Sequence, residues 1–361
     1  MDKKIKLFDP SVGNEELRIT QQVLKSHFWA SGAGVGYVKK FEASFKKYID
    51  SDDCVAVNSG TAALNLALSL MDIKGKEVVV PSLTFVATIN AILLNGGKPV
   101  FVDVEPHSMC IDPNQIEKLI TKKTKAVLPV HYAGMSCSLD KIEQICKKND
   151  LMLIEDAAHA AGAKFMGKRI GTHGNIVCFS FHPVKNLAMP TGGLIAINDS
   201  RYRKMKDVLL ARRWCGITSR DNFGYDVKEA GWNYYMNEIS AAIGLVQLKK
   251  LDSMNRIRRQ IAKRYSKEIN LEGKMPFDEN CSYHLYWIMV KNRKRFMEKM
   301  VSARIETGIH YRPVHTMSLY KKNVSLPMTE TAGKEIVSIP VHQNLSDIQI
   351  DRIIRVINDN V

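Results

Sequence analysis

Lys185 is a candidate for chemistry because its surroundings in the sequence are unusual for a lysine. It belongs to the segment FSFHPVKN (179–186), which follows an apolar run and precedes the glycine pair at 192–193. Most lysines stay on exposed surfaces, where the ammonium group remains hydrated. In a desolvated site the side chain loses its preference for the ammonium form and becomes an amine nucleophile. The segment therefore makes Lys185 a candidate for carbonyl chemistry through a Schiff base.

The segment VNSGTAAL (57–64) could bind an anion. Ser59, Gly60 and Thr61 follow the end of an expected strand and open an expected helix. A helix N-terminus offers free N–H groups and a partial positive charge, Gly60 lets the backbone approach closely, and Thr61 adds a hydroxyl. Ser and Thr are also ordinary helix caps, so this segment taken alone favours a cap.

The segment LIEDAAHA (153–160) ends an expected strand with two carboxylates, Glu155 and Asp156. In open α/β sheets, ligands bind outside the carboxyl ends of the strands. A carboxylate at that place is either a solvated loop residue or the partner of a cationic ligand atom. We expect His159 to lie near Asp156, although a lone histidine is more often a hydrogen-bonded structural residue.

The order of these three segments is more specific than any one of them. Pyridoxal 5′-phosphate (PLP) requires a Schiff-base lysine, an anionic partner for its pyridinium nitrogen and a phosphate site. The chain has a candidate phosphate loop, an aspartate and a lysine at successive strand ends, in that order. The ordered set therefore predicts a PLP site.

Short Val- and Ile-rich segments alternate with helical patterns through the first two thirds of the chain. The short segments are apolar on both faces, which is typical of strands in a parallel sheet covered by helices. The expected strands are 77–82, 98–104, 125–132, 151–156 and 175–181, and the expected helices are 61–71, 87–96, 113–121 and 139–150. This alternation predicts an α/β fold with right-handed crossovers.

The pattern changes near residue 237. Residues 237–269 are typical of one long helix or two abutting helices, and they precede a strand at 283–290 and helices at 293–305 and 347–359. The length of the chain favours two domains. We expect a large α/β domain over residues 1–245 and a smaller C-terminal α+β domain over residues 246–361.

Composition narrows the class of protein. The seven cysteines are scattered and never spaced as CxxC, which argues against a disulfide framework or a metal site and for the reducing cytoplasm. No segment approaches the roughly 20 apolar residues of a membrane helix, and the N-terminal residues lack the apolar core of a signal peptide. The net charge of +15 is compatible with solvated helix faces or with anionic small molecules. Nucleic acid is a weaker interpretation, because no binding motif accompanies the charge.

These residues give the chain a resemblance to a known family. It resembles the sugar aminotransferases of the DegT/DnrJ/EryC1/StrS family, which are fold-type I PLP enzymes of the aspartate aminotransferase superfamily. The resemblance covers nearly the whole chain. The matching segments are 41–49, 58–68, 78–92, 99–106, 125–134, 154–175, 179–186, 231–252 and 339–347.

The resemblance implies a role for each cofactor residue. Lys185 matches the lysine that forms the Schiff base with PLP, and Asp156 matches the carboxylate bound to the pyridine nitrogen. His159 matches a position beside the phenolic oxygen of the cofactor, and Phe85 matches the aromatic residue that stacks on the pyridine ring.

The phosphate and substrate sides are implied in the same way. Gly60, Thr61 and Ser180 match phosphate ligands. Asn233 matches an asparagine that reaches the phosphate from the neighbouring subunit, so the resemblance implies a homodimer with a shared active site. The substrate side is implied to contain His182, His310, Tyr311 and His315.

Two departures from the family pattern lie near the predicted site. The chain has AMPTGG (188–193) where many members have TTGEGG, so Pro190 and Thr191 replace Gly and Glu. Tyr235 replaces an arginine that many members carry. Both changes leave PLP binding intact and bear on which sugar and which amino donor are accepted.

The resemblance implies a cytoplasmic PLP-dependent aminotransferase. It would move an amino group from an amino acid, L-glutamate, to a nucleotide-linked keto-sugar, and its cofactor would pass through pyridoxamine phosphate. Amination of a keto-cyclitol uses the same machinery and stays open. Sugar dehydration in the same family typically has histidine in place of the lysine, so Lys185 argues against it. A regulatory or nucleic-acid-binding role on this scaffold is disfavoured by the intact lysine, aspartate and phosphate loop.

Overall fold

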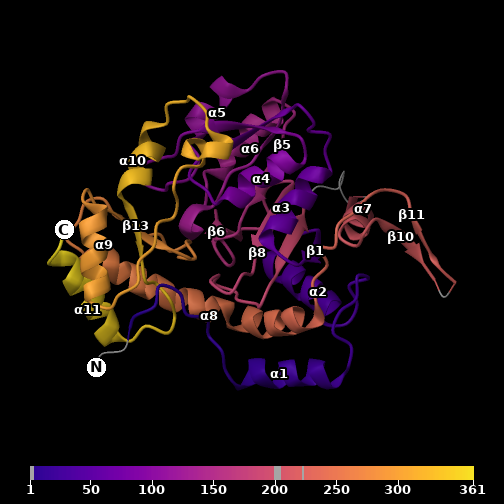
Figure 1. The fold of residues 1–361 in the computed structure, drawn as a ribbon, viewed down its shortest axis with the longest axis horizontal. Helices are drawn as coiled ribbons and strands as arrows, with labels where there is room; N and C mark the ends of the chain where they lie inside the picture. Colours follow the sequence, from indigo (N-terminus) through magenta and orange to yellow (C-terminus); the bar gives the residue numbers. More distant parts are fainter. Residues whose placement is uncertain (1–3, 199–204, 222) are drawn as a thin grey trace.

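The computed structural model describes residues 4–198, 205–221 and 223–361. A seven-stranded sheet forms the centre of the larger part, and helices cover both of its faces (Figure 1). The helices are α1 Asn14–Lys25, α2 Tyr37–Ile49, α3 Gly60–Ser69, α4 Val86–Leu94, α5 Pro113–Leu119, α6 Leu139–Lys148, α7 Met205–Arg212, α8 Glu238–Glu268, α9 Arg293–Ser302, α10 Pro327–Glu335 and α11 Asp347–Asn358. The strands are β1 Asp53–Val57, β2 Glu77–Pro81, β3 Lys98–Val102, β4 Thr124–Val127, β5 Met152–Asp156, β6 Lys164–Phe165, β7 Lys168–Arg169, β8 Ile176–Ser180, β9 Gly193–Ile197, β10 Ile217–Arg220, β11 Tyr225–Val227, β12 Tyr286–Met289 and β13 Ile336–Ile339.

The central sheet has the strand order β1-β9-β8-β5-β4-β2-β3. Neighbouring strands from β8 to β3 pair in parallel, whereas β9 pairs antiparallel with both β1 and β8. The carboxyl ends of β1, β2, β5 and β8 therefore point to the same edge of the sheet, which is where ligands bind in such folds.

Alternate residues of the strands supply two separate apolar cores. Val78 and Val80 of β2 belong to the core on one face, which includes the buried side of α3 and α4. Val79 belongs to the core on the other face, which includes α2, α6 and α8. Strands buried on both faces need apolar residues at every position, which explains their continuous Val- and Ile-rich runs.

The predicted α/β class is confirmed. Each strand expected from the large-domain pattern overlaps an observed strand, and residues 237–269 form one helix, α8, rather than two. The sequence analysis did not identify β9, the antiparallel strand. Its segment directly follows the glycine-rich turn after Lys185, so no intervening helical pattern separates it from β8.

Residues after 245 contain a second, smaller sheet made of β12 and β13, with α9, α10 and α11 around it (Figure 1). We propose that these residues form the smaller domain. The predicted boundary lies inside α8, whose Leu248 and Tyr265 belong to one apolar core that continues from the larger part into the smaller part. Among the described residues, none of the helices has the length and apolarity needed to cross a membrane.

Candidate active site

A cavity of about 360 Å³ lies at the sheet edge where the carboxyl ends of the parallel strands meet. Its wall comes from the loops after β1, β2, β4, β5 and β8, from the N-terminal segment and from two segments of the smaller part. Ten of the twelve predicted site residues line it: Gly60, Thr61, Phe85, Asp156, His159, Ser180, His182, Lys185, His310 and Tyr311. The structure thus brings together side chains that are up to about 250 positions apart in the sequence.

Lys185 is held in a turn after β8, in which its backbone N–H donates to the carbonyl of His182 at 2.8 Å. Burial lowers the pKa of the Lys185 amine from 10.5 to about 8, while the negative charge of Asp156 partly opposes this shift. A lysine with this pKa is neutral in a substantial fraction of molecules near neutral pH. The surroundings of Lys185 therefore disfavour the charged form of its amine.

Asp156 ends β5 with a carboxylate that is almost fully buried. Thr88 Oγ1 donates to Asp156 Oδ2 at 2.8 Å, and the backbone N–H of Ala158 donates to Oδ1 at 3.1 Å. Burial raises the pKa of Asp156, and these two hydrogen bonds and the charge of Lys185 oppose that rise. A carboxylate has capacity for more than two hydrogen bonds, so Asp156 can still accept one from a ligand in the cavity.

The start of α3 forms one side of the cavity. Ser59 caps the helix by accepting a hydrogen bond from the backbone N–H of Ala62 at 3.1 Å. A Cβ added at Gly60 would lie only 2.6 Å from Cβ of Ser180, so glycine is needed for this close approach. The approach places the first N–H groups of α3 beside the hydroxyl of Ser180 at the cavity wall.

His159 has one defined tautomer. Its Nδ1 accepts a hydrogen bond from the backbone N–H of Ala133 at 3.2 Å, so its proton is on Nε2, which contacts Tyr311 Oη at 3.1 Å. Burial and the charge of Lys185 hold the pKa of His159 well below its usual range, so the ring is neutral. His159 therefore presents a fixed N–H, rather than a charge, to the Tyr311 hydroxyl.

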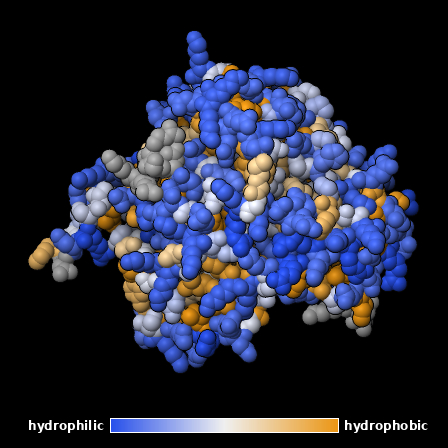
Figure 2. Space-filling view, turned by 180° about the vertical axis from the view of Figure 1, so that it is seen from behind, coloured by the Kyte–Doolittle hydropathy of each residue, from blue (hydrophilic) through white to orange (hydrophobic). Residues whose placement is uncertain are grey.

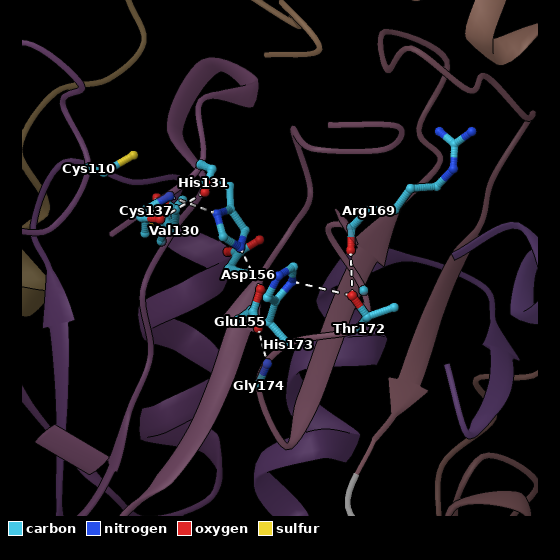
Figure 3. Close-up of polar contacts among 12 residues, drawn as sticks. Cys110, Val130, His131, Cys137, Glu155, Asp156, Arg169, Thr172, His173 and Gly174 are labelled. Carbon is cyan, nitrogen blue, oxygen red and sulfur yellow. Dashed lines mark hydrogen bonds and ion pairs between the residues drawn. The ribbon is translucent and has the colours of Figure 1, made fainter. Parts of the chain in front are cut away.

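Glu155 precedes Asp156 on β5 and points to the opposite side of the sheet, into a polar network shown in Figure 3. His131 Nε2 donates to Glu155 Oε2 at 2.7 Å, and the backbone N–H of Gly174 donates to Oε1. His131 Nδ1 accepts from the backbone N–H of Cys137 at 3.1 Å, which assigns the proton to Nε2. This network fixes the turn at 131–137, and that turn supplies the Ala133 N–H to His159.

Two predicted site residues do not line the cavity of their own chain. Asn233 is exposed, and its backbone carbonyl accepts a hydrogen bond from Asn58 Nδ2 at 3.2 Å. His315 is buried, with its Nδ1 2.7 Å from Ser82 Oγ. His315 therefore fastens its segment to the loop after β2, which carries Phe85, and does not face the cavity.

The sequence analysis missed His284 and Phe8, which also line the cavity. His284 Nε2 lies 3.4 Å from Lys185 Nζ, and the ring of Phe8 stacks on the His284 ring with centroids 5.5 Å apart. His284 stood inside a segment expected to be a strand, and nothing in the spacing links it to a lysine 99 positions earlier. Thr191, which belongs to one of the two departures from the family pattern, also lines the cavity. Its hydroxyl donates a hydrogen bond to the carbonyl of Asn58.

In the described part of the chain, no group of three or more His, Cys, Asp or Glu residues is arranged to hold a metal ion. The polar groups that line the cavity include an amine, a carboxylate and a helix N-terminus. These three groups fit the aldehyde, the pyridinium nitrogen and the phosphate of PLP.

Comparison with known proteins gives the same assignment. The model of the DegT/DnrJ/EryC1/StrS aminotransferase family matches residues 10–358. The chain is 34% identical to the spore coat polysaccharide biosynthesis protein SpsC of Bacillus subtilis, over 98% of this chain and 96% of that protein. PseC of Helicobacter pylori, an aminotransferase involved in the biosynthesis of pseudoaminic acid, superimposes with a TM-score of 0.92 at 27% identity, covering 99% of both chains.

The PLP form of Spr1654 from Streptococcus pneumoniae superimposes with a TM-score of 0.93 at 26% identity, covering 99% of this chain and 98% of that chain. Fold, cavity and relatives agree over nearly the full length of the sequence. The chain therefore belongs to the DegT/DnrJ/EryC1/StrS aminotransferase family and is a PLP-dependent aminotransferase with the fold-type I architecture.

Proposed function

We propose that the protein transfers an amino group from L-glutamate to the ketone of a nucleotide-linked keto-sugar. The observation that carries this proposal is one cavity that combines the Lys185 amine, the Asp156 carboxylate and the N-terminus of α3. The sugar aminotransferases among its structural relatives support a sugar as the acceptor of the amino group. The net charge of +15 suits an acceptor that carries a diphosphate.

Bound PLP would supply a carbonyl carbon that amines attack and a ring that accepts an electron pair, and as pyridoxamine phosphate it would carry the amino group between two half-reactions. The N–H groups at the start of α3, with the hydroxyls of Thr61 and Ser180, would hold its phosphate. Asp156 would accept a hydrogen bond from its ring nitrogen and keep that nitrogen protonated.

Lys185 would act twice. As a neutral amine it would hold the cofactor's carbonyl carbon, and as a free amine it would be the base that takes a proton from the substrate carbon. Its pKa of about 8 suits both steps, because the amine can lose and regain a proton near neutral pH. The fixed N–H of His159 would orient the Tyr311 hydroxyl, and Phe85 and Tyr311 would enclose the cofactor and exclude water.

A homodimer with a shared active site is part of the proposal, with Asn233 supplied by the neighbouring subunit. Asn233 is exposed and lies outside the cavity of its own chain, as a residue that serves a partner must. Large apolar side chains of α1 and the loop after it are exposed, including Leu17, Leu24 and Trp29. Apolar residues also gather in the lower part of the surface in Figure 2, which is otherwise largely hydrophilic. A subunit interface would cover such apolar surface.

We also propose that the protein works in the cytoplasm. All seven cysteines are free thiols, and six of them are buried. Free buried thiols are typical of proteins kept in a reducing compartment.

Two measurements test the proposed reaction. The purified protein should be yellow, and borohydride should link the cofactor covalently to Lys185, as mass spectrometry of the peptides would show. A panel of nucleotide-linked keto-sugars incubated with glutamate should yield an amino-sugar of the expected mass. Lys185→Ala should abolish the borohydride product and lower turnover by about 10³-fold or more. Normal turnover in this variant would show that Lys185 is the wrong lysine.

Subunit mixing tests the shared site. Lys185→Ala and Asn233→Ala proteins, each inactive alone, are mixed under conditions that allow subunit exchange. If Asn233 acts on the neighbouring subunit, a heterodimer has one site with both lesions and one intact site, so activity returns. Mixing Lys185→Ala with Asp156→Asn is the control, because both residues line one chain's cavity and no intact site can form. A fully active monomer in sedimentation would contradict the proposal.

A further inference from the structure

His284 is a buried histidine that lies directly against the reactive lysine. It comes from the segment between α8 and β12 and is 2% exposed. Its Nε2 lies 3.4 Å from Lys185 Nζ. Two rings pack against it, with its centroid 5.5 Å from that of Phe8 and 4.4 Å from that of His159. Its burial and these two ring contacts leave it little freedom to turn away from the lysine.

The surroundings of His284 keep its ring neutral. Burial, the positive charges of Lys185 and Arg258, and the neighbouring rings of His159 and His310 hold the pKa of His284 well below its usual range. Arg258 is buried and donates to backbone carbonyls, including that of Tyr283 at 3.2 Å, so its charge stays in place. The negative charge of Asp156, the carboxylate at the cavity, raises the pKa of Lys185 and so favours the lysine ammonium. A neutral imidazole has one nitrogen that accepts a hydrogen bond.

The hydrogen bonds decide which nitrogen of His284 accepts. A lysine ammonium can only donate, so the nitrogen that faces it, Nε2, must be the acceptor. The proton of the ring is then on Nδ1, which is buried without a hydrogen-bond partner within the described residues. Leaving Nδ1 unpaired costs free energy. An unpaired buried polar group in a native structure calls for an explanation. We infer that this cost is offset by the hydrogen bond that Nε2 can accept from Lys185.

We propose that His284 is a second catalytic residue, whose Nε2 accepts a hydrogen bond from the Lys185 ammonium and holds that side chain beside the cavity while it is detached from the cofactor. The proton that Lys185 takes from the substrate carbon stays on the lysine nitrogen and is shared with His284. The same nitrogen would then deliver this proton to the carbon of the cofactor that receives the amino group, so the proton lost by the substrate carbon is accounted for without another acid or base. Phe8 acts as a positioning residue, because its ring fixes the plane of the His284 imidazole. This inference rests on the proposed role of Lys185.

The acidity of Lys185 gives a direct test. In the cofactor-free full-length protein, the rate at which acetic anhydride labels Lys185 is followed against pH by mass spectrometry of its peptide. Wild-type protein should give an apparent pKa near 8 for Lys185. His284→Phe keeps a flat ring but removes the acceptor, so the ammonium loses a hydrogen bond and the pKa of Lys185 should fall by about one unit, tenfold in the equilibrium.

His310→Phe is the matched control. His310 lies at the same cavity near the charge of Lys185, but its Nδ1 is 2.9 Å from Ser338 Oγ and it makes no described hydrogen bond to the lysine. Its loss should leave the pKa of Lys185 nearly unchanged. The proposal is overturned if His284→Phe leaves that pKa unchanged, or if both variants shift it equally.

Turnover of the holoenzyme gives a second, independent measurement. His284→Phe and His284→Leu should lower kcat about 10- to 100-fold with little change in KM for the amino donor. His284→Gln, whose amide oxygen can accept the hydrogen bond, should recover most of the loss. Equal losses in all three variants would assign His284 a packing role only, and this comparison still decides if one variant is unstable. Absence of a borohydride product at Lys185 in wild-type protein would instead contradict the proposed function.

Discussion

Glu155 and Asp156 are neighbouring carboxylates at the end of β5, almost equally buried, yet they lie in different surroundings. Glu155 faces the protein interior, where His131 Nε2 and the Gly174 N–H donate to its two oxygens (Figure 3). Asp156 faces the cavity, where Thr88, Ala158 and the charge of Lys185 stabilise it and one face stays open to a ligand. Burial alone therefore does not separate a structural carboxylate from a functional one. The two kinds of carboxylate differ instead in whether a hydrogen-bond donor of a bound ligand can reach their oxygens.

The largest expected effect is on turnover, at Asp156. Asp156→Asn keeps the shape of the side chain and removes the charge that would keep the cofactor's ring nitrogen protonated. We expect kcat to fall by about 10²- to 10³-fold, with a change in the free energy of unfolding of less than about 1 kcal/mol. Steady-state kinetics and urea unfolding measure the two quantities. Near-normal kcat would remove the distinction drawn between the two carboxylates.

Glu155→Gln makes the opposite prediction. The amide keeps one acceptor, so either the His131 Nε2–H or the Gly174 N–H loses its partner inside the protein. We expect the free energy of unfolding to fall by about 2–3 kcal/mol, while kcat per folded molecule changes less than tenfold. Gly174→Ala is a matched variant, because a Cβ there would lie 2.6 Å from Glu155 Oε1 and disturb the same network. If Glu155→Gln lowered kcat as strongly as Asp156→Asn, Glu155 would belong to the active site.

The smallest expected effect concerns the pH dependence of stability in the cofactor-free protein. The pKa of Lys185 is about 8 in the folded chain against 10.5 ordinarily, so between these values the unfolded chain binds more protons and stability rises with pH. Below pH 8 both states are protonated and the folded state carries the full cost of the buried charge. Lys185→Met removes that cost, so it should be more stable than wild type at pH 7 by about 1–2 kcal/mol, allowing for the solvent in the cavity. The difference should shrink as the pH approaches 10.5. A constant difference from pH 7 to 10 would contradict the lowered pKa.

The sequence was sufficient where the chemistry depends on local pattern. Alternating strands and helices bring Gly60, Asp156 and Lys185 to one sheet edge, because parallel strands have their carboxyl ends together. The resemblance to the family supplied Phe85, His310 and Tyr311, all of which line the cavity.

The sequence was insufficient where a contact joins distant segments through packing alone. His284 meets Lys185 only because the β12 segment packs against the larger part, and Phe8 reaches it from the N-terminal segment. Neither position belongs to a periodic pattern or a motif with fixed spacing. The different surroundings of Glu155 and Asp156 also needed the structure, because His131 and Gly174 come from two other loops. The direction of the His315 side chain also needed the structure, because its contact with Ser82 joins two segments that no pattern in the sequence links.

The continuous α8 also affects how proteases would cut the chain. A protease needs an exposed segment of backbone that can unfold locally, and residue 245 lies within a helix of 31 residues that is packed along its length. The β10–β11 hairpin projects from the body instead, with Phe223 97% exposed and Tyr225 68% exposed (Figure 1). Chymotrypsin, which cuts after aromatic residues, should therefore nick the hairpin before it cuts the boundary between the two proposed domains. The fragments obtained from this protein would report the exposure of its backbone rather than its division into domains.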